Sequence, residues 1–192
     1  AYAGSTQAIR LASATPFVDN CTIQHNADGG IGGWTPDSTT IKITNNTIDD
    51  NAAHGIKIMF GSGAIFTIDG NTVSNSTFLN SNDVGGGDGI LFYSNNGPAT
   101  GTISNNTVSG NARRGIKIHT QGNGSVTITV SGNNITDNNQ LGISVIDESG
   151  VSALASSYSV SNNTITGNGG GISAGVRNPN DESSNRTSHI AM

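Results

Sequence analysis

The side chains in this sequence that could do chemistry lie close to repeated Gly-Ile dipeptides. They are His54, Lys57, Asp88, Tyr93, Arg114, Lys117 and His119. Lysine and arginine can bind the carboxylates of an acidic sugar, and a lysine, histidine or tyrosine can act as a base. The set suggests a lyase or epimerase acting on an acidic polysaccharide. Its catalytic candidates would be Lys57, Lys117, His119, Arg114 and Asp88.

Three other interpretations of these residues remain open. Asp88 could pair with His54 and Arg114 on a solvated face, where an ion pair contributes only about 0–1 kcal/mol. Exposed apolar side chains could instead form a contact strip between subunits, or could bind sugar rings without turnover. The ligand-binding or interface candidates are then Trp34, Met59, Tyr93 and His54.

A metal site is only weakly indicated. Asp83 and Asp88 flank a Gly-rich stretch at 82–88, which is the best calcium candidate in the chain. Two carboxylates are few for a cation that takes about 6–8 oxygen ligands. Asp147 and Glu148 are expected in a surface loop at 147–156. No Cys/His spacing typical of a metal or cofactor site occurs, so no cofactor is expected.

Composition limits the possible partners and the location of the protein. The net charge is −5 with only eight Lys and Arg residues, so the basic footprint of a nucleic-acid-binding protein is absent. No apolar run approaches the roughly 20 residues of a membrane-spanning helix. The single cysteine, Cys21, excludes an internal disulfide. A chain with 27 glycines and few charges favours an extracellular or cell-surface protein.

One repeated pattern must position these residues. It reads Asn-Thr-Ile, two further residues, Asn, a turn of variable length and Gly-Ile-x-Ile, as in 46–58. Six copies occur, and their first positions lie 25, 25, 35, 27 and 30 residues apart, starting at Cys21. A repeat of about 25 residues with variable insertions is typical of a solenoid.

Each repeat contains three short segments that alternate apolar and polar residues. The first precedes the asparagine, as at 41–43; the second surrounds Ile48; the third is 55–58. Such alternation predicts strands with one inward face, and matched residues should stack about 4.8 Å apart. We therefore predict an all-β fold, a parallel β-helix (β-solenoid) with three short parallel sheets and about six to seven coils.

The repeated asparagines are expected to hold the bends between strands. Asparagine tolerates left-handed backbone conformations, and its amide can bond the same group in the next coil. One predicted ladder contains Asn46, Asn71, Asn106, Asn133 and Asn163, with Cys21 in the first coil. The other contains Asn26, Asn51, Asn111, Asn138 and Asn168, with Ser76 in the third coil.

The repeats extend over nearly the whole chain. We expect one domain, 1–192, with regular coils at about 8–176 and a C-terminal tail at 177–192 that could supply a last strand or a cap. Both ends of the solenoid should present open strand edges, which natural sheets usually cover. Open edges on coils of constant cross-section favour end-to-end association.

The motifs Asn-Thr-Ile-x-x-Asn and Gly-Ile-x-Ile resemble those of right-handed parallel β-helix repeat proteins, the pectate-lyase-like superfamily. Variants such as the repeat at 165–172 are similar to repeats of surface proteins and adhesins on this fold. The resemblance implies a right-handed helix, and it implies no single function. The superfamily includes polysaccharide lyases and epimerases as well as adhesins and structural filaments.

The leading hypothesis is a non-catalytic extracellular structural or adhesive protein whose subunits stack end to end into a filament or surface layer. It is based on the low charge, the lack of a carboxylate cluster and the open ends. The alternatives are the lyase or epimerase described above and a carbohydrate-binding module. The expected partners are further copies of the chain and a polysaccharide, without nucleic acid or a membrane span.

Overall fold

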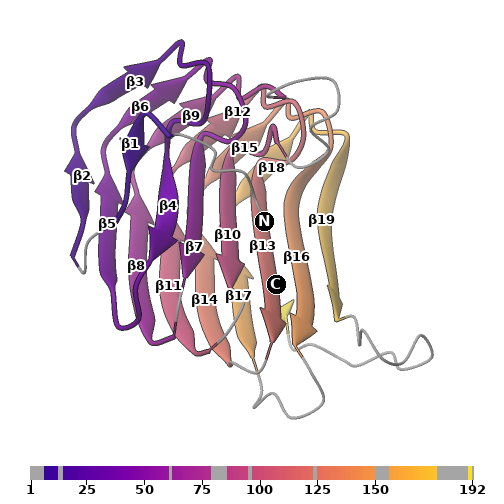
Figure 1. Cartoon of the computed structure of the whole chain (residues 1–192). Helices are drawn as coiled ribbons and strands as arrows, with labels where there is room; N and C mark the ends of the chain where they lie inside the picture. Colours follow the sequence, from indigo (N-terminus) through magenta and orange to yellow (C-terminus); the bar gives the residue numbers. More distant parts are fainter. Residues whose placement is uncertain are drawn as a thin grey trace.

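The strands of the protein wind into a right-handed parallel β-helix (Figure 1). The computed structural model describes residues 7–12, 15–60, 62–78, 86–94, 97–122, 125–149, 156–176 and 190–191. Within these residues every strand pairing is parallel, and no helix occurs. Accordingly, the described part of the chain contains no helix that could cross a membrane.

Three sheets run along the solenoid, and each repeat contributes one strand to each sheet. Sheet A contains β1 (Ile9–Arg10), β4 (Ile31–Thr35), β7 (Ile56–Phe60), β10 (Ile90–Ser94), β13 (Ile116–Gly122), β16 (Leu141–Ser149) and β19 (Gly170–Val176). Sheet B contains β2 (Phe17–Asp19), β5 (Thr40–Thr44), β8 (Ala64–Asp69), β11 (Ala99–Ser104), β14 (Val126–Ser131), β17 (Ser157–Ser161) and β20 (Ile190–Ala191). Sheet C contains β3 (Thr22–Gln24), β6 (Thr47–Asp49), β9 (Thr72–Ser74), β12 (Thr107–Ser109), β15 (Asn134–Thr136) and β18 (Thr164–Thr166).

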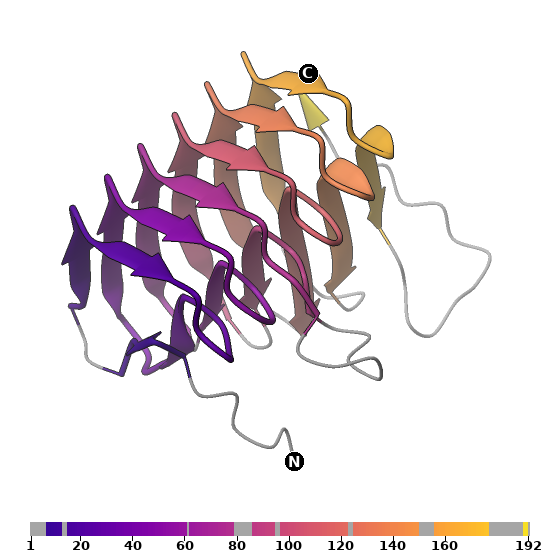
Figure 2. The same cartoon turned by 90° about the horizontal axis from the view of Figure 1, so that it is seen from above.

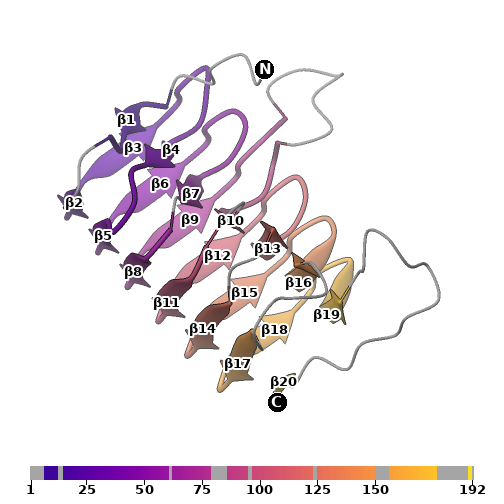
Figure 3. The ribbon, with the colours of Figure 1, turned by 60° about the horizontal axis from the view of Figure 1, so that its bottom comes forward.

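The predicted coil count was slightly high. Sheets A and B contain seven strands each and sheet C contains six, and the solenoid makes about five turns, against a prediction of six to seven coils. Figure 2 shows these coils stacked in sequence order, and Figure 3 shows β3 to β18 in one row beside sheet B. The sequence suggested a last strand within 177–192, and β20 pairs there with β17.

Equivalent apolar residues stack in columns, as the repeat predicts. In sheet A, Ile56 pairs with Ile90, Ile90 with Ile116 and Ile116 with Ile143, and all four side chains are fully buried. Burying one such side chain contributes about 1.5–3 kcal/mol. The narrow core is therefore a continuous apolar stack between the three sheets.

At one place in the core a large side chain lies next to a glycine of the neighbouring coil. Phe66 of β8 is in register with Gly101 of β11, and its ring stacks on Phe92 with centroids 4.9 Å apart. A Cβ atom at Gly101 would lie 1.9 Å from Phe66 Cε1. The glycine thus makes room for the ring of the preceding coil.

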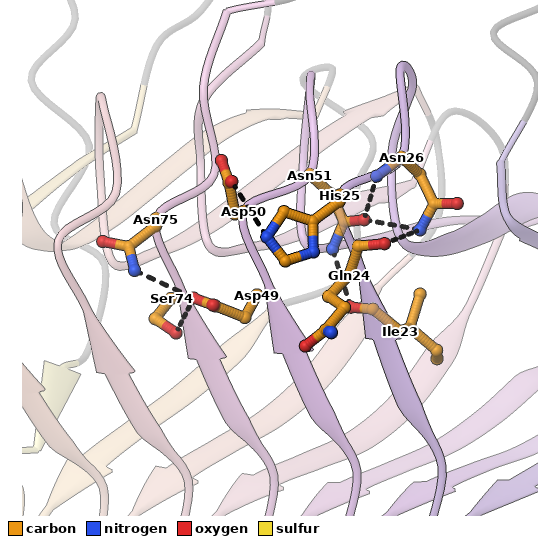
Figure 4. Close-up of polar contacts among 9 residues, drawn as sticks. All are labelled: Ile23, Gln24, His25, Asn26, Asp49, Asp50, Asn51, Ser74 and Asn75. Atoms are coloured by element: carbon orange, nitrogen blue, oxygen red, sulfur yellow. Dashed lines mark hydrogen bonds and ion pairs between the residues drawn. The ribbon is translucent and has the colours of Figure 1, made fainter.

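Both asparagine ladders form at the bends on either side of sheet C. In the first, Nδ2 of Asn46 donates to Asn71 Oδ1 at 2.9 Å, and Asn71 Nδ2 donates to Asn106 Oδ1 at 3.0 Å. In the second, Asn26 Nδ2 donates to Asn51 Oδ1 at 2.7 Å (Figure 4). The same contact continues the ladders from Asn106 to Asn133 and Asn163, and from Asn111 to Asn138 and Asn168. The ladders give the buried asparagine amides hydrogen-bond partners, without which their burial would cost free energy of folding.

Candidate functional site

The outer face of sheet A carries most of the residues that the sequence suggests for chemistry. Leu91 is in register with Lys57 on one side and Lys117 on the other. In the next outward row, Tyr93 lies between Met59 and His119. These residues come from β7, β10 and β13, which lie side by side in Figure 1. Three successive coils therefore bring the candidates together, and most of their side chains are half-buried.

A buried ionic cluster lies just before these strands. One oxygen of Asp88, Oδ2, lies 3.6 Å from His54 Nδ1, and the other, Oδ1, lies 3.4 Å from Arg114 Nη1. The Arg114 backbone N–H also donates to Asp88 Oδ1 at 3.2 Å. His54 is 3 % exposed and Asp88 is fully buried. The expectation that this column is solvated was therefore wrong for both residues.

Backbone pairing holds this cluster in place. The N–H of Gly87 donates to the carbonyl of Ala53 at 2.6 Å, and the N–H of Arg113 donates to the carbonyl of Gly87 at 2.8 Å. Gly87 has a φ of +84°, a conformation that glycine adopts readily. The segment before β10 thus lies between the corresponding segments of the neighbouring coils, which places Asp88 between His54 and Arg114.

The electrostatics of the cluster follow from its burial. Burial lowers the pKa of His54 from 6.5 to about 3, helped by the positive charges of Lys57, Lys117 and Arg113. Burial also raises the pKa of the Asp88 carboxyl, against the effect of Arg114. His54 is therefore neutral at pH 7. With so little exposure, neither side chain is open to a polymer outside, which favours a structural role for both.

A second polar network lies on the outer face at the ends of β10, β13 and β16. Tyr93 donates its hydroxyl to Gln121 Oε1 at 2.5 Å, and Gln121 Nε2 donates to Glu148 Oε2 at 2.6 Å. His119 Nε2 lies 3.1 Å from the same Glu148 oxygen. The His119 and Tyr93 rings are in edge-to-face contact, with their centroids 5.2 Å apart. Burial lowers the pKa of His119, against the hydrogen bond to Glu148. This network is more accessible than the His54 cluster.

The sequence did not identify two members of this network, Gln121 and Glu148. Asp147 and Glu148 were expected in a loop, but β16 continues to Ser149 and pairs with β13 through this stretch. The alternation of Val145, Asp147 and Ser149 with Ile146 and Glu148 was the available signal. Asp147 points inward, where its Oδ1 accepts from Thr120 at 3.1 Å and its Oδ2 from Tyr158 at 3.2 Å.

The remaining candidates are spread more widely. Trp34 of β4 is 52 % exposed and is in register with Met59, so the suggested apolar strip begins here. Lys117 is half-buried, and burial lowers the pKa of its ammonium group. Asp83 lies outside the described residues. In the described part of the chain, no three His, Cys, Asp or Glu side chains are grouped so that they could hold a metal ion.

Acidic residues at the end of β6 and in the turn that follows it already have polar partners. Asp49 Oδ1 accepts from Ser74 Oγ at 2.6 Å and from Asn75 Nδ2 at 2.8 Å, and both bonds lower the pKa of this carboxyl (Figure 4). His25 Nε2 lies 3.5 Å from Asp50 Oδ2 on the surface. These contacts link neighbouring coils, and they do not form a catalytic pair of carboxylates.

Comparison with known proteins identifies the architecture. A family model described as "Right handed beta helix region" matches residues 3–100 and 69–187. No curated protein and no solved structure matches the chain.

Proposed function

Because the chain belongs to the right-handed β-helix family, we propose that it is a non-catalytic structural protein of the cell surface whose coils stack end to end. The family supports a structural or surface-type β-helix protein in general terms. The burial of Asp88 and His54 further supports a non-catalytic role, since it removes one catalytic candidate and one ligand-binding candidate from solvent.

The observation that carries the proposal is the exposed end of the apolar core. In sheet A the inward isoleucines at 31, 56, 90, 116 and 143 are fully buried. Ile172, the next residue of this column, is 39 % exposed. Among the described residues, no strand pairs with the outer edge of β18 or β19. A further strand of sheet A placed here would cover Ile172 and pair with β19.

A second copy of the chain is the occupant that fits this end. Its first strand of sheet A, β1, would pair with β19, and its first strand of sheet B, β2, would then follow β20, so that both sheets continue in parallel. Contact between the last coil of one copy and the first coil of the next is heterologous, and repetition without ring closure produces a filament. The low charge of the chain, 11 % Asp, Glu, Lys and Arg, reduces repulsion between stacked coils.

Sedimentation velocity over a range of concentrations, with negative-stain electron microscopy, tests this proposal. The wild type should sediment faster as its concentration rises and should form rods of constant width. Ile172→Glu should stay dispersed, because a carboxylate would then face the incoming core. Ile65→Glu is the matched control, since Ile65 is 53 % exposed on the outer face of sheet B. A wild type that remains monomeric at all concentrations contradicts the proposal.

A second candidate function uses the outer face of sheet A. It is favoured by the pairing of His119 with Glu148 two positions beyond Lys117, because a carboxylate can orient an imidazole that acts as a base. The substrate would be an acidic polysaccharide, bound with the aid of Lys57 and Lys117. Incubation with pectate- and alginate-type polymers should then yield unsaturated products that absorb ultraviolet light, and Lys117→Ala should abolish them. Absence of turnover on both polymers would reject this function.

A further inference from the structure

The outer face of sheet C presents two rows of polar side chains, and the first row consists almost entirely of threonine. It consists of Thr22, Thr47, Thr72, Thr107, Asn134 and Thr164, which are in register from strand to strand and are all exposed. A second row, two residues further along each strand, consists of Gln24, Asp49, Ser74, Ser109, Thr136 and Thr166. Six strands thus display a two-row array made mainly of hydroxyl groups.

The core of the solenoid fixes the spacing of this array. Neighbouring parallel strands lie about 4.8 Å apart, and alternate residues of one strand lie about 6.6 Å apart. Each asparagine of the first ladder directly precedes an outward residue of the first row, so buried bonds such as Asn71 to Asn106 at 3.0 Å hold Thr72 and Thr107 in line. The residue between the two rows is an inward apolar one, such as Val73 or Val108, which is fully buried. The hydroxyls therefore sit on a rigid support.

The chemistry of this face suits ordered water better than a charged or aromatic ligand. Each threonine offers a hydroxyl that donates and accepts hydrogen bonds, next to a methyl group that water can only surround. The two rows contain a single charged residue, Asp49, and its carboxylate already accepts bonds from Ser74 and Asn75. Neither row contains an aromatic side chain.

We propose that the outer face of sheet C is an ice-binding surface. The spacing between strands is close to the repeat of water molecules along the a axis of hexagonal ice, so waters bonded to successive threonines can belong to one ice plane. A crystalline polysaccharide is the competing occupant with a regular repeat. Binding of sugar rings in a flat layer commonly uses aromatic platforms, which this face lacks.

The test is partition of the purified chain into slowly growing ice, combined with measurement of ice-crystal growth in supercooled droplets. The wild type should be enriched in the ice and should slow crystal growth. Thr72→Lys with Thr107→Lys should reduce the partition at least about tenfold, because two long charged side chains hold the ice plane away from the remaining row.

The matched control is Thr67→Lys with Thr102→Lys. These two threonines lie in the same coils, five residues earlier, on the outer face of sheet B. This variant should keep the partition of the wild type, and the thermal unfolding of both variants shows whether the solenoid is intact. The proposal is overturned if the wild type is excluded from ice, if the sheet B variant loses as much partition as the sheet C variant, or if the wild type binds crystalline cellulose instead.

Discussion

Ser76 and Asn111 occupy equivalent positions in neighbouring coils, and the backbone N–H of Ser76 donates to Asn111 Oδ1 at 3.0 Å. The Ser76 side chain continues the ladder no further, because its buried Oγ has no hydrogen-bond partner within the described residues. In other coils the asparagine at this position also donates to a carbonyl of the preceding coil, as Asn51 does to Ile23 O at 3.0 Å. Ser76 is thus a gap in an otherwise regular ladder.

Filling this gap should stabilise the protein. Ser76→Asn restores the missing amide, which can donate to Asn111 Oδ1 as Asn111 donates to Asn138 Oδ1 at 2.8 Å. Satisfying buried polar groups in this way contributes about 0.5–1.5 kcal/mol. Urea denaturation monitored by circular dichroism should therefore show a higher midpoint for the variant. Asn111→Ser is the reverse control and should lower it, and a less stable Ser76→Asn variant would contradict the assignment of the gap.

The repeat predicts the strands and their stacking because one repeat of the sequence forms one coil of the solenoid. Each Gly-Ile-x-Ile segment becomes a strand of sheet A, and the paired isoleucines at 56, 90, 116 and 143 confirm the predicted column. Asparagine at a bend and an aliphatic residue in the core are local preferences that most coils repeat, and Cys21 and Ser76 are the exceptions in the ladders. Insertions between repeats do not disturb them, since strands on either side of an insertion stay in register, as β7 and β10 do.

Burial of side chains on the outside of the coils was not predictable in the same way. The sequence places His54 and Asp88 outside the core, and whether they are solvated depends on what else packs there. The length of β16 was also missed, because Asp147 and Glu148 have low strand preference and their place was decided by pairing with β13. The threonine row of sheet C was present in the repeat itself, where Thr follows the ladder asparagine.

Acidification should destabilise the protein through His54. Its pKa falls from 6.5 to about 3 on folding, so between these values the unfolded chain binds a proton that the folded chain does not. Stability therefore falls as the pH falls through this window. Asp88 has the opposite sign, because its pKa is raised and protonation favours the folded chain. Between pH 7 and pH 5 the His54 effect corresponds to about 2 kcal/mol.

Comparison with His54→Gln isolates this effect. The free energy of unfolding of the wild type should fall by about 2 kcal/mol more than that of the variant between pH 7 and pH 5. His25→Gln is the control, since His25 is exposed and lies 3.5 Å from Asp50 on the surface. An equal pH dependence in the wild type and in His54→Gln would show that His54 is not buried in its neutral form.

The contact between Phe66 and Gly101 predicts a strongly destabilised variant. In Gly101→Ala the new methyl would lie 1.9 Å from Phe66 Cε1, so the ring must move in a filled core. Overpacking of this kind costs about 1–3 kcal/mol. Phe66→Val should relieve the clash, and the double variant should lose less stability than the sum of the single changes. Strictly additive losses would indicate that the two residues do not meet.

The buried hydroxyl of Tyr158 should contribute more to stability than the half-exposed hydroxyl of Tyr93. Tyr158 contacts Thr120 Oγ1 at 2.9 Å and donates to Asp147 Oδ2 at 3.2 Å, and burial raises the pKa of its phenol. Tyr158→Phe removes one donor from a buried carboxylate, which costs about 1–3 kcal/mol. Tyr93→Phe loses the bond to Gln121 at a site that water can reach, so its cost should stay below about 1 kcal/mol. Urea denaturation of the two variants measures both costs, and a larger loss for Tyr93→Phe would mean that Asp147 is held by its other contacts.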